Sequence, residues 1–139
     1  MAGYSGTPLA KKLGIKEGHC VLLVNPPAGF EKTLRRLPDD VEVRTGLRGK
    51  RQGDVIVCFC MRRTEMVRRF AELAGRLTPA GGLWIGWPKK ASGVETDLSD
   101  GIVREAGLKT GLVDNKVCAI DETWSGLRFV IRLKDRAKT

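Results

Sequence analysis

The sequence predicts an α/β domain in three layers. We expect a mostly parallel sheet of about six strands, helices on both faces and a C-terminal antiparallel β-hairpin. Apolar runs of strand length, at residues 20–24 and 54–61, do not alternate with polar residues, which is typical of strands buried on both faces. Segments with helical periodicity separate these runs. A short turn joins the last two strands, 112–120 and 127–133, and therefore favours a hairpin.

The first helix is predicted over residues 8–13. Thr7 suits the N-cap position and Pro8 the first helical position. The strand at 20–24 then ends at the turn 25–29, which reads Asn-Pro-Pro-Ala-Gly. Because open α/β sheets bind ligands outside the carboxyl ends of their strands, we expect the ligand site at this turn.

A second helix is predicted from the spacing of Phe30, Leu34 and Leu37, at i, i+4 and i+7. Residues 41–44 alternate between apolar and charged side chains, which indicates a short strand near an edge. Residues 45–53 contain glycines and basic side chains and are predicted to form a loop.

The second half continues the alternation of strands and helices. After the strand at 54–61, Thr64 is the predicted N-cap of a helix. The apolar face of that helix is expected to comprise Val67, Phe70, Leu73, Ala74 and Leu77. Residues 79–82 break the chain before a strand at 83–87, and residues 98–106 have the pattern of another helix.

The 139 residues suffice for one domain, 1–139, with a loose arm at 1–6 and a flexible tail at 134–139. The apolar runs are too short for a membrane span, and the N-terminus has no signal-peptide pattern. We therefore expect a cytoplasmic protein without a membrane partner. The oligomeric state stays open.

The net charge of +9 favours polyanionic partners, either nucleic acid or an anionic small molecule such as a nucleotide. The alternative is a basic surface without such a role, because the basic residues are spread along the chain and form no tail. The cysteines Cys20, Cys58, Cys60 and Cys118 lie in apolar runs. Buried free thiols are the favoured interpretation, with a zinc or redox site as the alternative.

Four segments in order resemble the class I S-adenosylmethionine-dependent methyltransferases, which have a Rossmann-like fold. Residues 13–22 resemble the lead-in to that family's first strand, and 54–57 its fourth strand. Residues 77–85 (Leu-Thr-Pro-Ala-Gly-Gly-Leu-Trp-Ile) resemble the turn into its fifth strand, and 104–108 the end of the domain. The resemblance implies a reduced methyltransferase-like domain with S-adenosylmethionine as a candidate cofactor.

The chain departs from the family pattern at the cofactor turn. The family has a glycine-rich turn there, whereas Pro26 and Pro27 remove two N–H donors and leave Gly29 as the permissive residue. An acidic residue that would hold the ribose is replaced by Arg44 and its neighbour. One strand–helix unit between the second and fourth strands is also missing. These departures favour a domain without a bound cofactor.

Residues 4–14 and 111–118 also resemble an uncharacterised bacterial family known only as a domain of unknown function. That resemblance implies a bacterial protein and carries no activity with it.

The candidate ligand site lies where the predicted strand order, 2-1-3-4, reverses direction. Asn25, Gly29 and Phe30 form one wall of the crevice. Trp87 is a candidate for stacking on a ring. The basic side chains expected to converge there are Arg44, Arg62, Arg63, Lys89 and Lys90. Guanidinium groups and two helix N-termini, at Phe30 and Thr64, would favour an anion.

The predicted function is a non-catalytic binding or regulatory module with a basic crevice for an anion or nucleotide. One alternative is a methyltransferase with a degenerate cofactor motif, and another is a nucleic-acid-binding protein. No catalytic residue and no metal site is predicted. His19, the single histidine, precedes the first strand and so lies at the opposite edge from the crevice.

Overall fold

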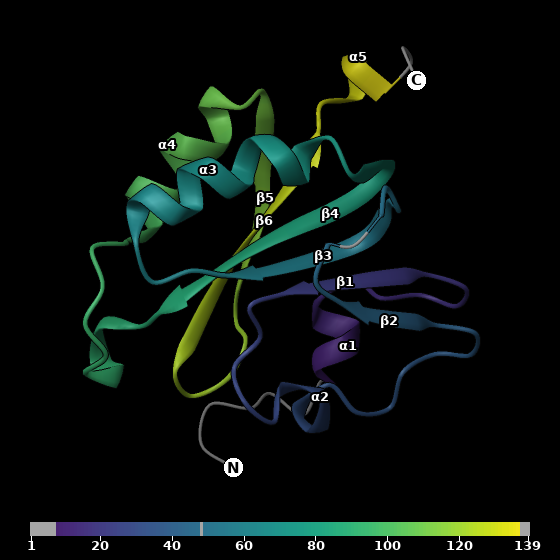
Figure 1. The fold of residues 1–139 in the computed structure, drawn as a ribbon, viewed down its shortest axis with the longest axis horizontal. Helices are drawn as coiled ribbons and strands as arrows, with labels where there is room; N and C mark the ends of the chain where they lie inside the picture. The colour runs from purple at the N-terminus through teal and green to yellow at the C-terminus, as the bar shows by residue number, and fades with distance from the viewer. Residues whose placement is uncertain (1–7, 48, 137–139) are drawn as a thin grey trace.

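A computed structural model describes residues 8–47 and 49–136 of the protein. A six-stranded sheet with the order β2-β1-β3-β4-β6-β5 forms its centre (Figure 1). The strands are β1 (Cys20–Val24), β2 (Glu42–Thr45), β3 (Gly53–Phe59), β4 (Leu77–Pro88), β5 (Leu112–Ala119) and β6 (Trp124–Ile131). The helices are α1 (Leu9–Lys12), α2 (Phe30–Thr33), α3 (Arg63–Ala74), α4 (Asp100–Lys109) and α5 (Leu133–Arg136), with a 3-10 turn, η1 (Lys90–Ser92).

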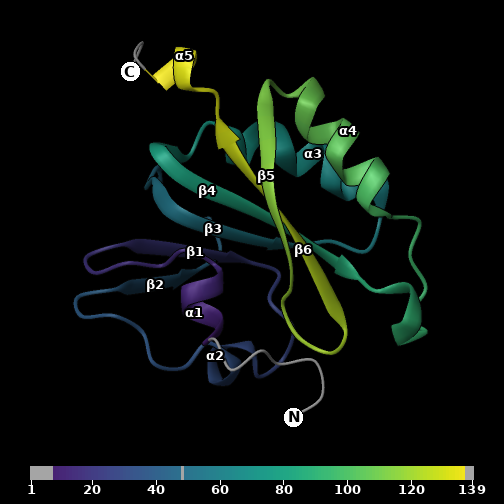
Figure 2. The same cartoon turned by 180° about the vertical axis from the view of Figure 1, so that it is seen from behind.

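The sheet is mostly parallel and ends in a hairpin. Strands β2, β1, β3 and β4 pair in parallel, in the predicted order. Strand β6 runs antiparallel to both β4 and β5. Helices α3 and α4 cover one face, and α1 and α2 cover the other, as the two views show (Figures 1 and 2). The predicted three-layer α/β fold class is confirmed.

Two apolar clusters fill the space between the layers. The cluster under α3 and α4 includes Leu22, Phe70 and Trp87. The cluster under α1 and α2 includes Phe30 and Trp84. Each of the strands β1, β3 and β4 contributes side chains to both clusters, which explains the apolar runs 20–24, 55–59 and 83–85.

Helix α2 is shorter than predicted. The spacing of Phe30, Leu34 and Leu37 predicts at least two turns, but the helix ends at Thr33. Arg36 adopts a left-handed backbone conformation with φ of 58°, which an α-helix cannot accommodate. Phe30 and Leu34 are nevertheless buried, so the apolar pattern identified a buried face and overestimated the length of the helix.

Helix α3 begins and packs differently from its prediction. The predicted N-cap, Thr64, lies inside the helix, and the N–H of Arg63 donates instead to a carboxylate oxygen of Asp97, at 2.8 Å. Val67, predicted to be buried, is 52% exposed, and Met66 takes its place in the core. A cap from a residue so distant in sequence gives no local sequence signal.

The Pro-Ala-Gly-Gly segment, 79–82, does not break the chain as predicted but lies within β4. Leu77 pairs with Gly53, and Gly82 then pairs with Val55, so the extra residues of β4 form a bulge. A bulge accommodates proline because its residues leave the ladder of hydrogen bonds.

The ends of the chain are described in part. Residues 133–136 form α5, so part of the predicted tail is helical. The predicted arm at 1–6, the N-cap residue Thr7 and residues 137–139 lie outside the described residues. Within residues 8–47 and 49–136, none of the helices has the length and apolar character needed to cross a bilayer.

Two glycines of α4 differ sharply in their surroundings and provide a test of the packing on β6. A Cβ atom at Gly107 would lie 2.1 Å from the ring of Phe129, whereas one at Gly101 would meet no atom within 4 Å. We expect Gly107→Ala to lower the free energy of unfolding by about 1–3 kcal/mol, because the buried ring must move. The matched variant Gly101→Ala should leave it unchanged or raise it by up to about 1 kcal/mol. Urea unfolding measures both, and equal effects would contradict the packing described.

Candidate functional site

The carboxyl ends of the parallel strands meet at one edge of the sheet, and the turn after β1 lies at its centre. Asn25 has a φ of 54° and Gly29 a φ of 79°, so the turn begins and ends with left-handed residues. The prediction that only Gly29 supplies this conformation is therefore wrong, since asparagine also tolerates it. A Cβ atom at Gly29 would meet no atom within 4 Å. The backbone of the turn is thus open to a ligand.

Carboxylates line this edge beside the predicted basic residues. The amide of Asn25 contacts the carboxylate of Glu65 at 3.5 Å, and Arg62 lies 3.9 Å from the carboxylate of Glu95. Asp97 accepts from the N–H of Arg63 at the start of α3. The partial positive charge of that helix end already faces an internal anion. The edge therefore carries both signs of charge.

Arg44 lies far from the other predicted basic residues. In the register of the sheet, Arg44, Leu22, Ile56 and Leu83 form one row across four strands. Lys89 follows Leu83 by six residues, which corresponds to about 20 Å along the strand direction. The predicted convergence of Arg44 with the lysines is not what the structure shows.

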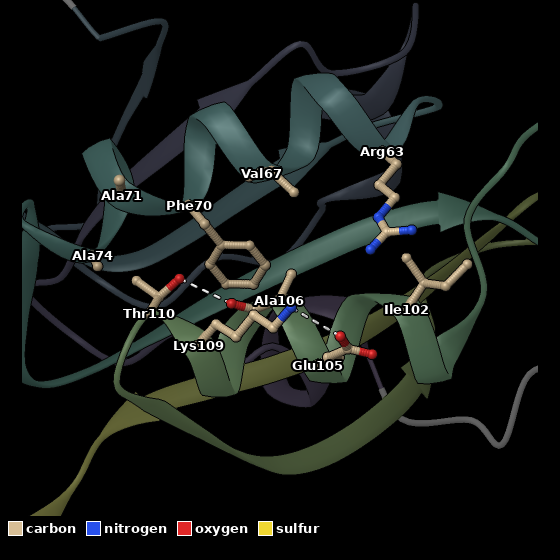
Figure 3. Close-up of a pocket in the computed structure, with 10 residues that line it drawn as sticks. All are labelled: Arg63, Val67, Phe70, Ala71, Ala74, Ile102, Glu105, Ala106, Lys109 and Thr110. Carbon is tan, nitrogen blue, oxygen red and sulfur yellow. Dashed lines mark hydrogen bonds and ion pairs between the residues drawn. The ribbon is translucent and has the colours of Figure 1, made fainter.

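Arg63 and Trp87 also turn away from the edge. Arg63 points from the start of α3 toward Ile102 and Glu105 of α4 (Figure 3). Trp87 is 6% exposed and belongs to the core, so its indole is not free to stack on a ligand. Phe30 is buried and packs edge-on against Phe59, with ring centroids 4.9 Å apart.

The remaining predicted residues stay at the carboxyl edge. Asn25 and Gly29 lie in the turn after β1, and Arg62 is exposed just before the start of α3. Lys89 follows β4, where its N–H donates to the carbonyl of Thr123 at 2.7 Å, and Lys90 is exposed in η1. Their roles as ligand-binding residues stay predictions.

A groove of about 670 Å³ runs between α3 and α4, on the outer side of these helices' shared face of the sheet (Figure 3). Val67 and Phe70 contribute to its apolar wall, and Arg63, Glu105 and Lys109 contribute charge. Glu105 and Lys109 are 3.0 Å apart. The hydrogen bond from Lys109, together with its charge, lowers the pKa of Glu105. The apolar pattern of α3 predicts a buried Val67 and therefore gives no sign of this groove.

A smaller hollow of about 300 Å³ lies between α2 and the end of β2. Its wall is formed by Leu34, Leu37 and Val43, with Glu31 and Thr45 at the polar positions. The hollow exists because α2 ends after one turn and the chain then passes beside β2. Glu31 follows Gly29 by two residues, so the hollow adjoins the open turn.

The thiols of Cys58 and Cys60 lie 3.6 Å apart in the core. The hydrogen bond with Cys60, together with burial, raises the pKa of Cys58. Within the described residues, no group of three His, Cys, Asp or Glu side chains could hold a metal ion. Cys118 is only partly buried, unlike the other three cysteines, and burial raises its pKa against the opposing charges of Lys12 and Lys116.

The accessibility of the thiols can be titrated with a chromogenic disulfide. We expect one thiol to react in the folded protein and all four to react after denaturation. Replacement of Cys118 by Ser should abolish the reaction of the folded protein. Because the thiolate is the reactive form and its pKa is raised, the rate should be slower at neutral pH than for an unstructured thiol and should rise steeply with pH. Rapid reaction of the Cys118→Ser variant would contradict the burial of Cys20, Cys58 and Cys60.

The left-handed conformation of Asn25 can be tested by substitution. We expect Asn25→Val to lower the free energy of unfolding by about 1–2 kcal/mol, because a β-branched residue is strained at positive φ. Asn25→Gly should change it by less than about 1 kcal/mol, since glycine adopts this conformation readily. Chemical denaturation distinguishes the two. Similar stability of the Val and Gly variants would show that the turn has another conformation.

Comparison with known structures identifies the fold. An S-adenosylmethionine-dependent methyltransferase from Aquifex aeolicus is 20% identical with a TM-score of 0.58, over 89% of this chain and 88% of that chain. Aeropyrum pernix fibrillarin, in complex with natively bound S-adenosyl-L-methionine, is 12% identical with a TM-score of 0.56, over 92% and 70%. A chain of the complex between the Haloferax volcanii Trm112 methyltransferase activator and a methyltransferase is 12% identical with a TM-score of 0.64, over 89% and 87%.

The sequence matches no protein-family model and no curated protein, so its resemblance to an uncharacterised bacterial family stays a prediction. The similarity to the solved structures extends over most of the chain at low sequence identity. The chain therefore has the Rossmann-like fold of the class I S-adenosylmethionine-dependent methyltransferases.

Proposed function

We propose that this chain binds S-adenosylmethionine at the carboxyl edge of the sheet and acts as a small methyltransferase. The observation that supports this proposal most strongly is the turn after β1. The turn is open at Gly29 and has left-handed residues at both ends. Its first residue, Asn25, contacts the carboxylate of Glu65, and Glu31 follows its last residue by two positions. The turn lies where the order of the strands reverses, which is the ligand position of open α/β sheets.

The residues around the turn fit the chemistry of this cofactor. The cofactor carries a positive sulfonium group and ribose hydroxyls, and both are favourable beside carboxylates. The apolar wall of Leu34, Leu37 and Val43 suits the adenine ring, with Glu31 positioned to accept from a hydroxyl. When bound, the cofactor would supply an electrophilic methyl group. A carboxylate at the end of β2 is absent, and Glu31 and Glu65 are the proposed replacements.

The solved structures favour the methyltransferase over the non-catalytic module with a basic crevice. A non-catalytic ligand-binding module nevertheless stays the second candidate. The observation in its favour is the pair Pro26 and Pro27, which leaves the turn with two fewer N–H donors. Nucleic acid stays a proposed partner because of the net charge of +9, and in that case it would be the methyl acceptor or a separate ligand.

Calorimetric titration with S-adenosylmethionine tests the proposal. We expect micromolar binding to the unmodified protein and at least tenfold weaker binding to Gly29→Asn. Asparagine tolerates a positive φ, so the turn is preserved, while its side chain occupies the space through which the cofactor must approach.

Gly18→Asn is the matched control. Gly18 has a φ of 76° and equally open surroundings, but it precedes β1 and so lies at the opposite edge of the sheet. This variant should bind like the unmodified protein. The proposal would be overturned by an absence of binding to the unmodified protein, or by equal losses in the two variants.

A further inference from the structure

The connection between β2 and β3 has no helix among its described residues, 46–47 and 49–52. These strands lie on either side of β1, so the connection must pass over one face of β1. Leu47 packs against the cluster that lies under α3 and α4, which identifies the face that is crossed. The main helix contacts on this face lie beyond β1 and β2, since α3 packs on β4 and α4 packs on β5 and β6.

A pocket of about 220 Å³ lies beneath this connection. Its lining residues are Leu22, Arg44, Thr45, Gly46, Arg51 and Arg76. Arg44 comes from β2, Arg51 from the connection, and Arg76 from the segment between α3 and β4. Two arginines from adjoining segments and one from a distant segment therefore line the pocket together with the apolar Leu22.

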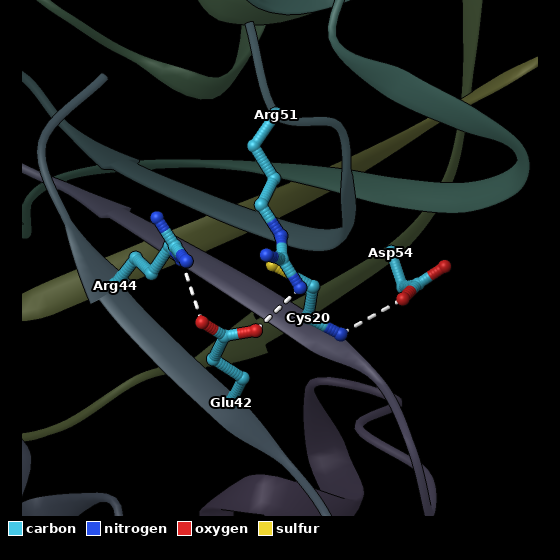
Figure 4. Close-up of polar contacts among 5 residues, drawn as sticks. All are labelled: Cys20, Glu42, Arg44, Arg51 and Asp54. Atoms are coloured by element: carbon cyan, nitrogen blue, oxygen red, sulfur yellow. Dashed lines mark hydrogen bonds and ion pairs between the residues drawn. The ribbon is translucent and has the colours of Figure 1, made fainter. Parts of the chain in front are cut away.

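Two of these arginines share one carboxylate as their ion-pair partner. Glu42 lies between Arg44 and Arg51 and forms an ion pair with each, at 2.7 Å to Nε of Arg44 (Figure 4). The other nearby carboxylate, Asp54, accepts from the N–H of Cys20 and the hydroxyl of Thr78. The three arginines of the pocket outnumber these two carboxylates.

Arg76 has an unused donor. Its carbonyl accepts from the N–H of Gly53 at 2.8 Å, which fixes its backbone beside the start of β3. Its Nη1 is buried and has no hydrogen-bond partner among the described residues, and the same holds for Nε of Arg69. Arg69 belongs to α3, whereas Arg76 follows the end of that helix. Buried donors without partners are costly, and a bound acceptor would relieve that cost.

We infer that this pocket is a phosphate-binding site, separate from the carboxyl edge, that takes the phosphate or pyrophosphate group of a small phosphorylated molecule. Guanidinium groups bind phosphate oxygens in pairs, and three of them converge here. The bound group would compete with Glu42 for Arg44 and Arg51 and would accept from Arg76. A single hollow suits a small molecule better than nucleic acid, whose backbone requires a continuous basic stripe.

The test is calorimetric titration with inorganic pyrophosphate and phosphate at low ionic strength. We expect Arg76→Gln to weaken pyrophosphate binding at least tenfold. Arg68→Gln, at an exposed position of α3, is the matched control and should bind like the unmodified protein. Glu42→Gln should tighten binding severalfold, because it frees Arg44 and Arg51; a purely structural role of Glu42 would not produce tighter binding.

Thermal unfolding of each variant establishes that it is folded, and only folded variants are compared. The inference is overturned if the unmodified protein binds neither anion, or if Arg76→Gln binds as well as Arg68→Gln. It is also overturned if a DNA duplex binds in an Arg76-dependent way while pyrophosphate does not, since that result indicates a nucleic-acid surface. Gly29→Asn should bind pyrophosphate normally, so failure here and failure of the proposed cofactor site are distinguishable.

Discussion

The hand of the crossover connections determines which face of the sheet each connection covers. From β1 to β2 the chain moves one way across the sheet, and α2 packs in the cluster with Phe30. From β2 to β3 and from β3 to β4 it moves the other way, and Leu47 and Phe70 pack in the opposite cluster. Crossover connections between parallel strands are right-handed. A right-handed connection that moves across the sheet in the opposite direction must therefore pass over the opposite face. Both faces of β1 and β3 are covered for this reason, and their sequences are apolar throughout.

The same constraint places an irregular connection where a helix would otherwise cover the sheet. On that face β2 presents Glu42 and Arg44 at half-buried and exposed positions, while the neighbouring β1 is fully buried. The stems of arginine side chains can cover apolar surface while their charged ends reach water, and Arg44 and Arg51 lie over Leu22 in this way. Where a crossover helix would form an apolar interface with the sheet, this chain thus has a hollow lined by arginines.

The high net charge predicts a basic carboxyl edge, but the edge carries both signs of charge. The basic residues do not concentrate there: Arg44 lies on a sheet face, and Arg63 lies over the groove between α3 and α4. The loop after η1 instead brings Glu95 and Asp97 to the edge, where they face Arg62 and the start of α3. The edge consequently suits a ligand with hydroxyl and cationic groups, in agreement with the proposed S-adenosylmethionine site.

The sequence alone determined the fold class, the order of the parallel strands and the position of the turn after β1, because these depend on local apolar runs and on breakers such as Pro26 and Gly29. The tertiary structure alone decided which charged groups meet. The cap from Asp97, the pairing of Glu42 with Arg51 and the unpartnered nitrogen of Arg76 depend on strand register and loop paths. Side chains distant in sequence meet through packing, and no local pattern encodes that.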